Sequence, residues 1–240
     1  MNNTFDIKRF GQVVAKDWKN FIRNFGISLI VWCCLPILIW IFSLVVDIKV
    51  YGDARLIFIA IFVYSVLLFA PAKIYGNANL SRDGISFATL PATSLEKFLS
   101  MVLYCSILPP IIVGLGSWAI DSMLTLLPFG GFKEFVVLPK QFLGAMFITA
   151  ICQCLMISAM FQFGNMIFKK RKVGKTIAWA LLLLFVITML FQIAHLWGHI
   201  SAWLSTARGK TALWTINAIV FAIAVVFYLF TYRRIKKQTY

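Results

Sequence analysis

Few residues in this sequence could do chemistry, and their spacing matches no complete metal site. His195 and His199 lie four residues apart and could share one helix face, as two zinc ligands do. A zinc site also needs a third ligand and usually a base, and no acidic residue stands near this pair. We therefore interpret them as histidines at a membrane interface beside Trp197.

Two further patterns fall short of a catalytic or nucleotide site. Gly174-Lys175-Thr176 resembles the end of a phosphate-binding loop, but Lys169 stands where that loop needs a glycine. The five cysteines all lie inside apolar runs, where a thiol behaves as a small hydrophobic group. We expect no catalytic residue, metal or cofactor in this chain, and no enzyme activity of its own.

Acidic residues are scarce, which bears on ion-driven transport. There are eight in the chain, and Asp121 is the one placed near a membrane core, at the outer end of a predicted span. Transporters driven by protons or sodium usually keep an ionisable group at mid-depth. The pattern argues against such a transporter, although Asp121 leaves that interpretation open.

Three amides lie within one apolar run: Gln153, Gln162 and Asn165. Amides in hydrocarbon tend to form hydrogen bonds across helices, so adhesion between helices is the interpretation we favour. The alternative is that they line a substrate path, and these three are our candidates for one.

The elements that carry these residues are predicted to be membrane-spanning helices. Hydrophobic residues make up 61% of the 240-residue chain and charged residues 13%, far from a soluble domain. A spanning helix needs about 20 mostly apolar residues, and each helix satisfies its own backbone hydrogen bonds. We predict an all-α membrane protein with six transmembrane helices within 26–240, at about 26–46, 56–76, 97–121, 140–168, 176–197 and 212–232. Pro109-Pro110 predicts a kink or break in the third span.

Residues 1–25 are predicted to form an amphipathic helix at the membrane interface. Ile7, Phe10, Val14, Trp18 and Phe21 recur every three or four residues, while Lys and Arg occupy much of the rest. Such a helix before a span typically lies among lipid headgroups.

The distribution of cations predicts the orientation. Seventeen Lys and Arg fall on one side of the predicted spans and six on the other. The richer side is cytoplasmic by the positive-inside rule, so both termini are expected there. The net charge of +15 is then accounted for by orientation and attraction to anionic membrane lipid, without nucleic acid.

The loop over residues 77–97 is too apolar for an ordinary connection. Asp83-Gly84 predicts a turn, and Pro91 ends the short element before it. Thr93 and Glu96 have the spacing of a capping box, which predicts a new helix leading into the third span. An apolar element on the cytoplasmic face suits docking into a partner's groove. The alternative is a re-entry at the interface that only touches lipid.

The phrase from Ser86 to Ser100, SFATLPATSLEKFLS, resembles the cytoplasmic loop of type-2 ATP-binding-cassette (ABC) transporter permeases. The layout of an interfacial helix, six spans and cytoplasmic ends is similar to that family as well. The resemblance implies that the loop is a coupling element seated on a separate ATP-binding subunit. The docking residues would be Phe87, Leu90 and Pro91, surrounded by a polar rim. The rim would comprise Arg82, Asp83 and Glu96.

The same resemblance implies an exporter permease in a bacterial cell (inner) membrane. It would pair with a second permease subunit, as a homodimer or with a relative, and move an unknown, amphipathic substrate. The competing hypothesis from another class is a non-transporting membrane scaffold, sensor or assembly subunit with the same topology.

Overall fold

The computed structural model describes residues 5–76, 78, 89–128, 130–132, 134–136, 147–168, 170–193 and 209–238, and within these ranges all regular structure is helical. The elements are α1 (Ile7–Val46), α2 (Gly52–Ile74), α4 (Ser94–Val102), η1 (Leu103–Ile107), α5 (Leu108–Thr125), α6 (Phe147–Ile167), α7 (Lys172–Ile193) and α9 (Gly209–Gln238). Because α4, η1 and α5 follow one another without a gap, the described part of the chain forms six helices.

Five of these helices are long and apolar enough to cross a membrane. They cover Ile7–Val46, Gly52–Ile74, Ser94–Thr125, Phe147–Ile167 and Trp214–Lys237. Large apolar side chains such as Ile27 and Val45 on α1 are more than three-quarters exposed. Lipid is the solvent that makes such exposure favourable. The protein is therefore a multi-pass membrane protein.

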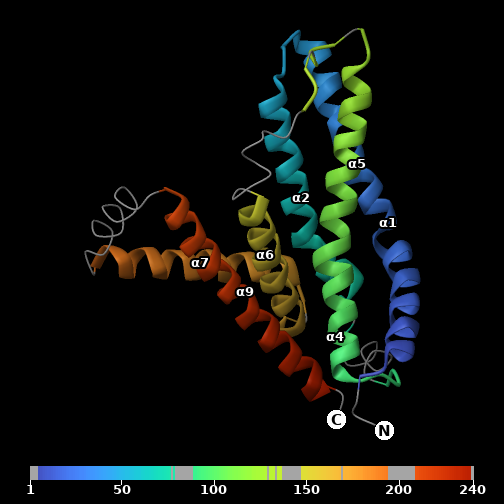
Figure 1. The fold of residues 1–240 in the computed structure, drawn as a ribbon, viewed down its shortest axis with the longest axis vertical. Helices are drawn as coiled ribbons and strands as arrows, with labels where there is room; N and C mark the ends of the chain where they lie inside the picture. The colour runs from blue at the N-terminus through green and yellow to red at the C-terminus, as the bar shows by residue number, and fades with distance from the viewer. Residues whose placement is uncertain are drawn as a thin grey trace.

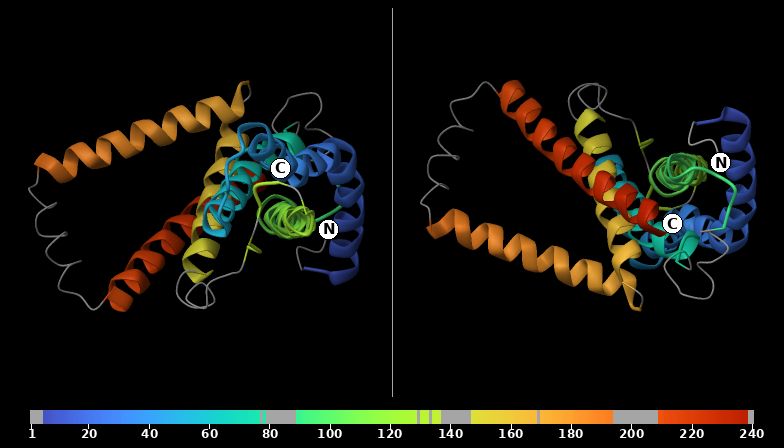
Figure 2. Two further views of the ribbon diagram at one scale, coloured as in Figure 1. Left: turned by 90° about the horizontal axis from the view of Figure 1, so that it is seen from above. Right: turned by 90° about the horizontal axis from the view of Figure 1, so that it is seen from below.

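The remaining helix, α7, differs in direction from the others. It covers most of the predicted span 176–197, but Figure 1 shows it running across the direction of α2 and α5. Figure 2 shows α7 and α9 extending from α6 away from the group of α1, α2 and α5. A sixth crossing, by α7, stays a prediction.

The N-terminal segment and the first span form one helix. The sequence predicted a boundary near residue 25, whereas α1 continues for 40 residues without interruption. Phe21 and Phe25 are buried in the core, while Trp18 is 45% exposed. The predicted apolar face is therefore shared between the protein core and the surroundings. Its placement among headgroups stays a prediction.

The third span accommodates its prolines without breaking. Leu103–Ile107 is a π-helical turn directly before Pro109-Pro110, and the helix continues as α5. A wider turn relieves the clash between a proline ring and the preceding carbonyls, and it tolerates the missing N–H. Of the predicted kink or break, the break is wrong for this reason, and the helix departs from regular α geometry at Leu103–Ile107 instead.

The core lies where α1, α2 and the α4–η1 segment meet. Phe21, Leu67, Met101 and Tyr104 are each almost fully buried there. Outside this core, α1 and α5 approach each other closely. A Cβ added to Gly116 of α5 would lie 2.6 Å from Cys33 Sγ of α1. Small residues allow this approach between membrane helices.

Both ends of the described chain lie at the same end of the molecule (Figure 1). That the two termini share one side of the membrane stays a prediction, as does which side that is.

Candidate functional site

The helix that follows the candidate docking loop begins with the predicted capping box. The Glu96 backbone N–H donates to Thr93 Oγ1 at 3.3 Å, and the Thr93 N–H donates to Glu96 Oε2 at 2.8 Å. Two free N–H groups at the start of α4 are thereby satisfied. The capping box is confirmed.

Glu96 also ties α4 to the start of α1. Its Oε1 accepts hydrogen bonds from the Asp6 backbone N–H at 2.9 Å and from Arg9 Nη2 at 3.2 Å. Its side chain is fully buried by these contacts. The Glu96 carboxylate is thus occupied by contacts within the protein, and its predicted place in the polar rim of the docking surface stays a prediction.

A single buried carboxylate, that of Asp17, joins both ends of the loop. Asp17 Oδ2 accepts hydrogen bonds from the Tyr75 hydroxyl and from the Ser100 hydroxyl, each at 2.6 Å. Tyr75 directly follows α2, before the loop, and Ser100 lies in α4, after it. No sequence pattern indicated this role, because Asp17 stands in a basic amphipathic segment.

The entrance to the loop has further restraints. Asn165 of α6 donates from Nδ2 to the Tyr75 carbonyl at 3.1 Å, and the Lys172 ammonium donates to the Gly76 carbonyl. On the exit side, the Tyr104 hydroxyl donates to the Val14 carbonyl at 2.7 Å. The segment 77–97 is thus anchored at both ends to helices of the bundle.

The docking residues are only partly within the described chain. Arg82, Asp83 and Phe87 lie outside the described residues. Leu90 is half-buried against the core, and Pro91 is exposed.

Leu95, which sequence reasoning did not choose as a docking residue, is 41% exposed in the first turn of α4. Successive side chains on a helix turn by about 100°, so the inward direction of Glu96 and Lys97 leaves Leu95 facing out. The predicted capping box could have indicated the exposure of Leu95, because it defines where the helix begins.

The three candidate substrate-path amides lie in different surroundings. Gln162 is fully buried; its Nε2 donates to Ser106 Oγ at 2.7 Å and Ser158 Oγ at 3.1 Å. Ser106 Oγ also lies 2.8 Å from the Tyr228 hydroxyl, so this network links η1, α6 and α9. Within the described chain, Gln162 Oε1 has no hydrogen-bond partner. The contacts of Gln162 therefore match the interpretation that it holds helices together.

Gln153 lies beside an apolar cavity and is the amide best placed for contact with a ligand. Gln153 is exposed, and its Oε1 accepts a hydrogen bond from the Tyr64 hydroxyl at 2.7 Å. Tyr64 lines a cavity of about 500 Å³ between α2, α5 and α6, together with Val63, Ile111 and Trp118. The cavity could hold the apolar part of a molecule, with one polar pair at its edge.

Asp121 forms a buried ion pair with Arg55, far from the candidate docking loop. Arg55 Nη1 lies 3.2 Å from Asp121 Oδ2 and donates to Thr125 Oγ1 at 2.9 Å. Arg55 also donates to the Glu134 carbonyl, and its guanidinium lies 4.2 Å from the centre of the Phe132 ring. Both ionised side chains are about 1% exposed. Asp121 is thus held by a fixed partner.

No protein-family model, curated protein or solved structure matches this chain. Its fold and composition define a helical multi-pass membrane protein.

Proposed function

We propose that this chain is the permease subunit of an ABC-type exporter that works with a separate ATPase subunit. The observation that supports it is the pair of hydrogen bonds at Asp17, which join the two ends of the apolar loop 77–97. A loop that is restrained at both ends can pass a displacement to the helices that hold it. The proposed coupling role requires this property.

The restraints define where a displacement would go. Through Glu96 and Ser100, α4 is bonded to α1. Through Asn165, the end of α2 is bonded to α6. Movement of the loop by a docked ATPase would therefore act on four helices together. Closure of the ATPase around ATP would favour one arrangement of the helices over another, which is a population shift driven by differential affinity.

The proposed docking surface combines Phe87 with the exposed Pro91 and Leu95. A second permease subunit would supply the other half of the transport unit. The apolar cavity beside Tyr64 and Gln153 fits the proposal of an amphipathic substrate, because one polar pair borders an otherwise apolar lining.

The ion-driven alternative receives less support. A coupling carboxylate must exchange its ion during transport, whereas Asp121 is buried against Arg55. Separating a buried pair leaves an uncompensated charge and costs about 3–5 kcal/mol. A structural role for the pair is the simpler account.

Co-purification tests the proposal. The tagged chain would be isolated in mild detergent from its own cells, and the eluate assayed for bound ATPase. We expect a stoichiometric ATPase with the unmodified chain, and its loss with Phe87→Asp or Leu95→Asp. Leu126→Asp is the matched control, because Leu126 is 72% exposed and directly follows α5, which ends far from the termini (Figure 1).

The alternative outcomes are distinct. Equal ATPase recovery from the Leu95 and Leu126 variants would place the docking surface elsewhere. A stable preparation without ATPase, from cells in which a known transporter complex survives the same extraction, would reject the exporter and favour the scaffold hypothesis.

A further inference from the structure

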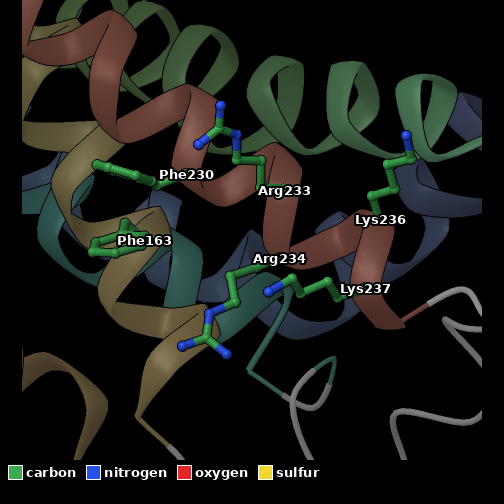
Figure 3. Close-up of a pocket in the computed structure, with 6 residues that line it drawn as sticks. All are labelled: Phe163, Phe230, Arg233, Arg234, Lys236 and Lys237. Carbon is green, nitrogen blue, oxygen red and sulfur yellow. The ribbon is translucent and has the colours of Figure 1, made fainter.

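Two cavities of the described chain differ in what they could bind. The larger, of about 800 Å³ at the C-terminal end of α9, is lined by Phe163 and by five residues of α9. Figure 3 shows Arg233 and Arg234 pointing to different sides of the helix, so these cations do not converge on one ligand. The smaller cavity, of about 500 Å³ between α2, α5 and α6, has a polar pair at its edge instead.

The lining of the smaller cavity is apolar and uncharged. Thirteen described residues form it, and none of them carries a charge. The Trp118 indole N–H is already used, because it donates to the Val136 carbonyl at 3.1 Å. A charge placed among such residues would be desolvated without a partner, which is strongly unfavourable. The lining therefore favours an uncharged molecule, and the volume is within the range of about 300–1,000 Å³ of small-molecule sites.

The cavity runs along the helices and reaches the middle of a predicted span. Its lining extends from Leu56 to Tyr64 on α2 and from Pro110 to Trp118 on α5, and eight helical steps cover about 12 Å. Tyr64 lies at the middle of α2, a helix long and apolar enough to cross a membrane. Phospholipid headgroups and the ester groups next to them lie outside the hydrocarbon layer. A phospholipid would thus place its chains, and not its carbonyls, beside Tyr64.

The polar pair at the edge of the cavity has more donors than it uses. The Tyr64 hydroxyl and the Gln153 amide carry three hydrogens that can be donated, and the pair shares one hydrogen bond of 2.7 Å. No acceptor in the described part of the chain takes the other two. The surplus is the same if the amide is turned around, since one N–H then replaces the O–H. Gln153 is exposed, so these donors are open to a ligand that brings an acceptor.

We propose that this cavity binds a neutral fatty-acyl ester. The acyl chain lies along α2 and α5, and the ester carbonyl accepts a hydrogen bond from the Gln153 amide. Such a carbonyl is an acceptor without charge, which is what the surplus of donors and the apolar lining require. Where the inference names the substrate class of an exporter, it rests on the proposed function. The binding itself needs only this chain.

Photo-crosslinking tests the site on the full-length chain in phosphatidylcholine nanodiscs, without an ATPase. The probe is the methyl ester of a fatty acid with a diazirine in its chain, and peptide mapping by mass spectrometry locates the label. We expect labelling at Val63 of α2 and Ile111 of α5. Excess methyl palmitate should displace the probe, whereas hexadecane, which lacks the acceptor, should compete about three- to tenfold less well. Palmitate should also compete less well, because its carboxylate brings a charge into an apolar site.

Two variants and their controls tie the ligand to this cavity. Gln153→Leu removes the amide donors and should lower probe affinity about three- to tenfold, while Gln12→Leu removes an exposed amide from α1 and should change nothing. Leucine suits a position that faces lipid, so the Gln153 variant should fold. Ala150→Leu fills part of the cavity and should abolish most of the labelling; Ala222→Leu, at an exposed position on α9, is its control.

Three results would overturn the site: equal competition by hexadecane, unchanged labelling in both cavity variants, or exclusion of the probe by the excess phosphatidylcholine. The outcome is separable from that of the exporter proposal. Specific labelling of a chain that recovers no ATPase would support the site and reject the exporter. Recovery of the ATPase by a chain without specific labelling would overturn the site and leave the exporter standing.

Discussion

The hydrogen bond between Asp17 and Ser100 connects two residues 83 positions apart, with the carboxylate oxygen 2.6 Å from the hydroxyl. Tyr75 donates to the same oxygen. One carboxylate of α1 therefore holds together the chain that enters the candidate docking loop and the chain that leaves it. Hydrogen bonds to an ionised group are stronger than neutral ones, so this junction should contribute measurably to stability.

Ser100→Ala is expected to lower the free energy of unfolding by about 2 kcal/mol, because a buried carboxylate loses one of its donors. Unfolding of the purified protein in a mixed-detergent titration measures the change. Ser122→Ala is the matched control, because the Ser122 hydroxyl donates to Trp118 within the same helix. If both variants unfold alike, Asp17 does not need the Ser100 donor.

Glu96→Ala is expected to lower stability by about 2 kcal/mol, since it removes the capping box and the contact with Arg9 together. Glu96→Gln should cost about half as much, because glutamine can still accept from the Thr93 N–H. Amide hydrogen exchange at the start of α4 would localise the effect. Protection that is equal in the two variants would show that the contact with Arg9, and not the cap, holds this turn.

Asp121→Asn is expected to destabilise the protein by about 3–5 kcal/mol, because Arg55 would be left as a buried, uncompensated charge. Arg55→Met combined with Asp121→Leu should recover much of that loss. Detergent unfolding of the two variants makes the comparison. A stable Asp121→Asn variant that has lost ion-driven uptake would instead revive the secondary-transporter hypothesis.

Gly116→Cys is expected to form a disulfide with Cys33 under mild oxidation. A Cβ added at position 116 would lie 3.2 Å from Cys33 Cβ, slightly less than the separation of about 3.5–4.5 Å in disulfides, so a small outward shift would bring the pair into range. Peptide mapping by mass spectrometry identifies the linked pair. Gly114→Cys is the control, because its added Cβ lies nearest to Val63 instead. Linkage of position 114 but not 116 to Cys33 would contradict the described packing of α1 on α5.

Several features were predictable because they depend on neighbours in the sequence. The capping box at Thr93 and Glu96 involves groups three residues apart, so spacing alone was enough. The apolar runs indicated the helices that are long enough to cross a membrane. By contrast, Pro109 and Pro110 predicted a kink or break, because spacing does not reveal how a neighbouring turn can widen and let the helix continue.

The amino-acid sequence by itself determined the class of this protein. Long apolar runs leave helices as the favourable way to satisfy backbone groups in lipid. The partners of its buried polar groups were decided by the tertiary structure alone. Asp17 meets Tyr75 and Ser100, and Asp121 meets Arg55, across separations of 58 to 83 residues. Such partners are selected by which helix faces pack together, and that selection depends on the whole set of contacts rather than on any local pattern.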